Sequence, residues 1–109
     1  MVVDLNDTFA ALSDPTRREI LSRLVDGPAS VSQLVEPFEI SQQAISKHIA
    51  VLRNAGLVRQ ERKGRINWCR VEPQPLENAV AWFELYRSLW QGRLDRLEQH
   101  LQTSAGSDD

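Results

Sequence analysis

The sequence predicts a mainly α-helical (α+β) domain of the winged helix-turn-helix class. Two helices, predicted over 30–35 and 41–56, follow each other after about four residues, which is the spacing of a helix-turn-helix. Beyond them the hydrophobic period changes from about 3.6 residues to about two over 57–71, which predicts a β-hairpin. The chain has 109 residues, of which 41% are apolar, so it is about one domain long. We expect a single domain over 1–102 and a disordered tail over 103–109.

The first three helices are predicted from their start and stop signals. Apolar residues recur at helical spacing over about 4–12, which predicts the first helix. Asp14 stands before a proline, so it can cap a second helix that Asp-Gly-Pro at 26–28 ends. Ser30 and Gln33 have the spacing of a capping box, which predicts the start of the third helix. The predicted order is therefore four helices, a hairpin and a last helix.

The fourth helix has a polar side that contains no acidic residue. Ser41 is its expected cap, Gly56 its expected stop, and Ile45, Ile49 and Leu52 recur at the spacing of one buried side. A face that is only solvated would normally carry some Asp or Glu, and between the cap and the stop there is none. This pattern favours a polyanion as the partner of the polar side.

A recognition helix places its first residues in the major groove of DNA, so these residues should be donors and acceptors without carboxylates. Glutamine can pair with adenine, serine with several bases, and lysine with guanine or a phosphate. His48 lies beside the apolar side of the helix, so we expect it mainly to be packed and bonded to a backbone group, although it can also lie near a phosphate. The residues expected to read bases are Gln42, Gln43, Ser46 and Lys47.

The charge of the chain is unevenly distributed. The formal net charge is −2, but 41–71 holds seven basic residues and one acid, a local net charge of +6 that leaves −8 for the rest. The tip of the predicted hairpin is basic around a glycine turn at 63–64, which suits contact with phosphates, although solubility alone would also explain it. The residues expected to contact the DNA backbone are Ser41, His48, Arg53, Arg62, Lys63, Arg65 and Arg17.

The last helix, predicted over about 76–101 after two prolines, has two apolar stripes. One stripe can lie on the core of the domain, while the second needs a partner, and symmetric dimers are the commonest oligomers. The alternative is that both stripes pack into one core. The residues expected at a homodimer interface, formed with the first helix, are Leu5, Phe9, Trp82, Phe83, Tyr86, Leu89, Trp90, Leu94 and Leu97.

Several classes of protein are disfavoured by composition. The single cysteine, Cys69, allows no internal disulfide and no multi-cysteine metal cage, and we expect it to fill the hairpin rather than to act as a redox switch. No apolar run approaches the ~20 residues that span a bilayer, and the amino terminus lacks signal-peptide features, so we expect a cytoplasmic protein without membrane contact. Neither a phosphate loop nor a nucleophile paired with a base is present, so we expect no enzyme.

Four segments in order carry a family resemblance: ALSDPTRREIL at 11–21, ISQQAISKHI at 40–49, LRNAGLV at 52–58, and Gly64-Arg65. The chain resembles the ArsR-type winged-helix transcriptional regulators over about 5–72, and its last helix resembles their metal-site-lacking branch of SdpR-like autorepressors. The resemblance implies a cytoplasmic homodimer, joined through its first and last helices, that binds a palindromic operator of double-stranded DNA and usually represses. It names no small-molecule effector.

Founding members of that family sense metals through Cys-x-Cys-Asp on the third helix or an Asp/His set on the last. Here the third-helix segment 30–36 has no cysteine, and Asp95, Glu98 and His100 match the second set poorly. We therefore expect no metal and no cofactor. The alternative function is a winged-helix adaptor that binds proteins and not DNA, and it would favour acidic or apolar residues beside Gln42.

Overall fold

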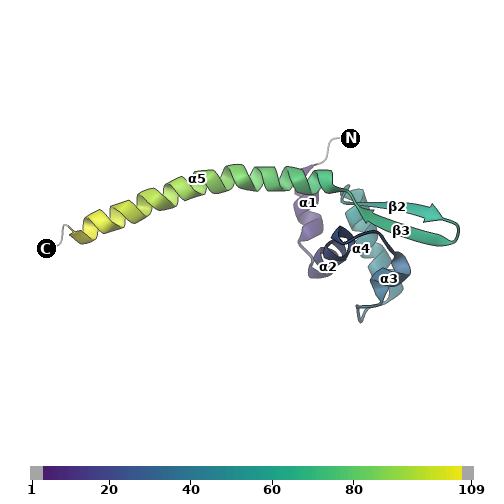
Figure 1. The fold of residues 1–109 in the computed structure, drawn as a ribbon. Coiled ribbons are helices and arrows are strands. Elements are labelled where there is room, and N and C mark those ends of the chain that lie inside the picture. Colours follow the sequence, from purple (N-terminus) through teal and green to yellow (C-terminus); the bar gives the residue numbers. More distant parts are fainter. Residues whose placement is uncertain (1–3, 107–109) are drawn as a thin grey trace. The chain divides into compact units, whose positions relative to one another are not determined.

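The computed structural model describes residues 4–106. Its elements, in chain order and as labelled in Figure 1, are α1 (Leu5–Leu12), α2 (Pro15–Val25), β1 (Ala29–Ser30), α3 (Val31–Val35), α4 (Gln42–Asn54), β2 (Val58–Lys63), β3 (Ile66–Val71) and α5 (Pro73–Gly106). The chain divides into two compact units, and the boundary along the sequence lies between Asn78 and Ala79. The first unit holds every element up to the start of α5, and the second holds the rest of that helix.

The predicted caps of the helices are confirmed. The Asp14 carboxylate accepts a hydrogen bond from the backbone N–H of Arg17, and the Ser41 hydroxyl accepts one from the N–H of Ala44, both at 3.1 Å. At the start of α3 the capping box is complete, since Ser30 and Gln33 each accept with the side chain from the other's backbone N–H. These bonds satisfy N–H groups that have no partner within the first turn of a helix.

The core of the first unit lies where α2, α3 and α4 meet the sheet. Its largest fully buried apolar side chains come from all of these elements and from the chain between α4 and β2: Ile20, Leu24, Leu34, Ile45, Ile49, Leu52, Leu57 and Cys69. Helix α1 contributes Ala11 and Thr8, which are fully buried, whereas Leu5 and Phe9 of the predicted stripe are only half-buried. The buried side of α1 is therefore formed by its smaller residues rather than by the large apolar residues that the helical period indicated.

The sheet has three antiparallel strands in the order β1-β3-β2. Strand β1 was not predicted, because its two residues, Ala29 and Ser30, are too few to show a period of two; they pair with Cys69 and Trp68. The hairpin was predicted, but its turn lies one residue later, at Gly64 and Arg65, since Lys63 pairs with Ile66. Gly64 has φ +64°, the glycine-favouring position of a two-residue type II′ hairpin turn.

Helix α5 is longer than predicted at both ends. It begins at Pro73 rather than near residue 76, because prolines in a first turn remove only N–H groups that lack helical partners. It continues through Gly106, so 103–106, expected as tail, belong to the helix. The remainder of the expected tail, 107–109, lies outside the described residues.

The capping box at the start of α3 gives a stability prediction. We expect Ser30→Ala to lower the free energy of unfolding by about 1 kcal/mol, because the N–H of Gln33 loses its acceptor. Urea unfolding followed by circular dichroism measures the change. The control is Ser32→Ala in the same helix, whose side chain is exposed, and an equal loss for the two variants would contradict the cap.

Candidate nucleic-acid interface

Helix α4 separates its apolar and polar residues by burial. Ile45, Ile49 and Leu52 are at most 1% exposed and face the core. The four residues predicted to read bases, Gln42, Gln43, Ser46 and Lys47, are all exposed on the same helix. Since the first turn contains no acid, nothing on this face of the helix would repel a phosphate.

The wing places its three predicted cations together. Arg62, Lys63 and Arg65 are all exposed at or beside the turn of the hairpin. The Arg62 Nε donates to the carbonyl of Gly64 at 3.3 Å, which ties that side chain to the turn. Figure 1 shows the hairpin extending away from the helices, as a wing must in order to reach a groove of DNA.

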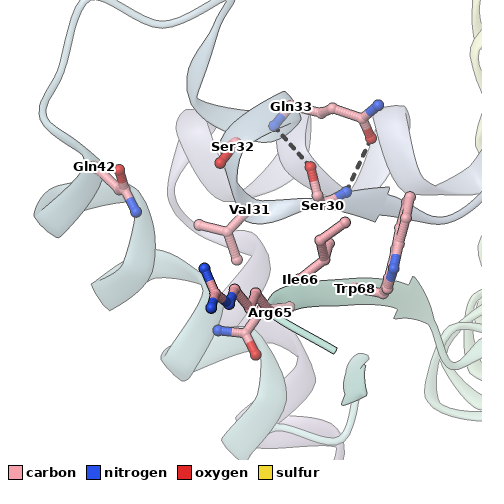
Figure 2. Close-up of a pocket in the computed structure, with 9 residues that line it drawn as sticks. Ser30, Val31, Ser32, Gln33, Gln42, Arg65, Ile66 and Trp68 are labelled. Carbon is pink, nitrogen blue, oxygen red and sulfur yellow. Dashed lines mark hydrogen bonds between the residues drawn. The ribbon is translucent and has the colours of Figure 1, made fainter. Parts of the chain in front are cut away.

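A cleft of about 360 Å³ lies between the start of α3, the start of α4 and the wing. Gln42 lines it from α4, and Arg65 and Asn67 line it from the wing, as Figure 2 shows for the first two. Ser32 and Trp68 are among the other residues that line it. The structure therefore brings a predicted base-reading residue and a predicted backbone residue to one surface. Ser32 and Asn67 were missed because no local pattern marks a residue that faces a cleft built from three elements.

Arg53, at the end of α4, is tied to the wing. Its Nη1 donates to the Oε1 of Gln60 on β2, whose Nε2 lies 3.9 Å from the Cys69 sulfur. The Cys69 side chain is fully buried, and desolvation raises the pKa of its thiol, so the reactive thiolate is disfavoured. This burial agrees with the packing role expected for Cys69.

The structure gives Arg17 contacts within the protein that the sequence did not predict. Its side chain is half-buried, and its Nε and Nη2 donate to the carbonyls of Ala11 and Ala10 at 2.6 and 3.2 Å. Its Nη1 lies 3.3 Å from the Nδ1 of His48 on α4. Three of its donor atoms are thus directed into the protein, because the start of α2 lies against the end of α1.

His48 is half-buried, as its place beside the apolar side of α4 indicated, but the expected backbone partner is wrong. The contact is with the Arg17 guanidinium, and the Asp14 carboxylate lies 3.8 Å from the same Nδ1, beyond hydrogen-bond distance. The pKa of Asp14 is lowered, mainly because its carboxylate accepts a hydrogen bond from the backbone N–H of Arg17. Asp14, Arg17 and His48 therefore form one cluster at the junction of three helices.

The second unit is a single helix with a broad apolar surface. Trp82 stacks on Tyr86 with ring centroids 4.8 Å apart, and the Arg93 guanidinium lies 5.8 Å from the ring centre of Trp90. The predicted interface residues of α5 are all exposed in the single chain, by 39 to 59%: Trp82, Phe83, Tyr86, Leu89, Trp90, Leu94 and Leu97.

Residues 4–106 contain neither a cluster of metal-binding side chains nor a membrane-spanning helix. Among those residues, no three His, Cys, Asp or Glu side chains form a group that could hold a metal ion. In the same part of the chain, no helix has the length and hydropathy needed to cross a membrane.

The fold and the exposed helix-turn-helix define a winged-helix protein of the DNA-binding class, and comparison with known proteins gives its family. The family model described as bacterial regulatory protein, arsR family, matches residues 14–60. The transcriptional repressor SdpR of Bacillus subtilis (strain 168) is 35% identical over 78 residues, which cover 72% of this chain and 87% of SdpR. The chain belongs to the ArsR family.

Solved structures agree with this family. A crystal structure of an ArsR family transcriptional regulator has a TM-score of 0.74 and 41% identity, covering 80% of this chain and 90% of that chain. An ArsR-like transcriptional regulator from Rhodococcus sp. RHA1 has a TM-score of 0.72 and 37% identity, covering 87% and 90%. The protein is a DNA-binding transcriptional regulator, and its family consists of regulators rather than enzymes.

Proposed function

We propose that this regulator is a homodimeric repressor that binds an inverted-repeat operator through α4 and the wing. The observation that carries the proposal is the exposed, acid-free first half of α4 beside a basic hairpin tip. Helices of this kind enter the major groove with their first residues, and a wing beside them meets the backbone or the minor groove. Repression, rather than activation, is proposed by analogy with SdpR, which is named as a transcriptional repressor.

We assign the two kinds of DNA contact to different residues. Gln42, Gln43, Ser46 and Lys47 would read base edges, because their side chains are exposed donors and acceptors at the start of α4. Ser41, Arg53, Arg62, Lys63 and Arg65 would hold the backbone, which adds affinity and salt dependence more than specificity. Arg17 and His48 are left out of this surface, since they contact each other inside the first unit.

Dimerisation through α5, with Leu5 and Phe9 of α1, is supported by the apolar surface of α5. Large apolar side chains on a soluble helix favour a partner that removes them from water, and each buried Leu or Phe contributes about 1.5–3 kcal/mol. Members of the ArsR family are typically dimers. A twofold dimer would place its recognition helices in successive major grooves about 34–36 Å apart, so the operator should be an inverted repeat.

The adaptor alternative, which binds proteins and not DNA, is less well supported. A protein-docking face at the start of α4 would favour large apolar or aromatic residues, and the exposed residues there are two glutamines, a serine and a lysine. The cytoplasmic location expected from the sequence stays a prediction.

Gln43 is predicted to read a base. We expect Gln43→Ala to cost about 1–3 kcal/mol at one base pair in each half-site and to relax specificity at that pair only. Binding to duplexes that vary one pair at a time measures this effect. If the variant kept the base preferences of the parent at every position, Gln43 would not be a base-reading residue.

Lys63 is predicted to contact a phosphate. We expect Lys63→Ala to weaken binding to all duplexes alike and to lower the slope of log K against log salt by about one. Titrations at several salt concentrations measure the slope. The control is Lys63→Arg, which keeps the charge and should keep the slope; an unchanged slope in the alanine variant would remove Lys63 from the interface.

The apolar surface of α5 is predicted to hold the dimer together. We expect Trp90→Glu, and likewise Trp82→Glu, to give a monomer and to abolish tight operator binding, because a charge would be buried between two helices. Light scattering at micromolar concentration measures the oligomeric state. The matched control is Ser88→Glu, on the polar side of α5, which should stay dimeric, whereas a monomeric parent protein would overturn the dimer.

A further inference from the structure

Arg17 connects three helices of the first unit. Its backbone is fixed in the first turn of α2, where its N–H donates to the Asp14 carboxylate at 3.1 Å. Its side chain reaches back to the last turn of α1, where the carbonyls of Ala10 and Ala11 accept from it. The last carbonyls of a helix have no helical partner, so a guanidinium there is a favourable cap.

The same guanidinium also reaches the recognition helix. Its Nη1 lies 3.3 Å from the His48 Nδ1, and arginine has donors but no acceptor, so this contact is a hydrogen bond when Nδ1 carries its lone pair. His48 directly follows Ser46 and Lys47, which belong to the proposed DNA-reading face. The planar fork of arginine keeps its donors in fixed directions, so one side chain joins α1 to α4 in a defined geometry.

Arg18 provides an internal comparison. It is exposed, and its Nη1 donates to the carbonyl of Leu12 at 2.7 Å, so it too caps the end of α1. The contacts given by the structure do not join it to α4. The two neighbouring arginines therefore share the capping function, and contact with the recognition helix distinguishes Arg17.

We propose that Arg17 is a positioning residue, which fixes α4 relative to α1 through His48 and thereby sets the spacing at which two recognition helices meet an operator. The inference rests on the proposed dimer, in which α1 is part of the interface. If α1 is held to the twofold axis, the Arg17 to His48 contact determines where α4 stands relative to that axis. A shift of α4 would then change the preferred separation of half-sites without removing any atom that contacts DNA.

The test uses the full chain and a duplex that the parent protein selects from random-sequence DNA, together with the same duplex carrying one extra base pair between its half-sites. We expect Arg17→Gln to bind the selected duplex about tenfold more weakly and to lose most of the parent's preference for the unaltered spacing. Its salt slope should equal that of the parent, because no phosphate contact is removed. The matched control, Arg18→Gln, should keep the affinity and the spacing preference of the parent.

A pair of variants on α4 tests the same contact from the other side. His48→Leu should reproduce the loss of spacing preference, whereas His48→Asn, which offers an amide oxygen as acceptor near the former Nδ1, should restore it in large part. Combining Arg17→Gln with His48→Leu should weaken binding no more than the stronger single change does, because both remove one interaction. If circular dichroism shows that Arg17→Gln is unfolded at the assay temperature, the two His48 variants test the positioning role instead.

Four results would overturn the inference. A fall of about one in the salt slope of Arg17→Gln, with equal weakening on every duplex, would make Arg17 a phosphate contact. The same loss of spacing preference in Arg18→Gln would assign the effect to the capping of α1 alone. If Arg17→Gln and His48→Leu each bound both duplexes as the parent protein does, Arg17 would have no positioning role. The proposed function would then stand unchanged. A parent protein that selected no duplex would instead overturn the proposed function itself, and this inference with it.

Discussion

The apolar side of α4 is buried in the middle of the first unit, where Ile45, Ile49 and Leu52 are at most 1% exposed. Burial of each such side chain contributes about 1.5–3 kcal/mol, so the helix has one strongly favoured rotation about its axis. That rotation leaves Gln42, Gln43 and their polar neighbours in solvent. The surface proposed to meet DNA is therefore a consequence of core packing, and a substitution in the core would alter that surface even with every contact residue unchanged.

The remaining contacts of α4 limit how far it can move along or away from the core. Arg53 ties its end to β2 through Gln60, and His48 ties its middle to Arg17. Both are hydrogen bonds at the edge of the core. The strength of a hydrogen bond depends on its direction more than apolar packing does. The helix is thus connected separately to the wing and to α1, two elements that meet different partners in the proposed complex.

Charge in this protein follows its elements rather than its overall composition. A net charge of −2 conceals a segment of +6 that coincides with α4 and the wing. Because an ionic field is screened within about 8–10 Å at ordinary salt, DNA would respond to this local charge and not to the acidic flanks.

Local sequence signals were sufficient for the helices, their caps and the acid-free side of α4, because each of these depends on residues no more than about four positions apart. They also gave the hairpin, although its turn was placed one residue too early. Strand β1 was out of reach, since two residues gain strand geometry only by pairing with Cys69 and Trp68. The same limit applies to Arg17, which looked like one more surface cation. It lies 31 positions before His48 in the sequence, and a contact over that separation depends on how α1, α2 and α4 pack. The chain's own pattern therefore indicated which helix would face DNA, and three-dimensional packing decided that Arg17 of α2 turns inward to contact that helix.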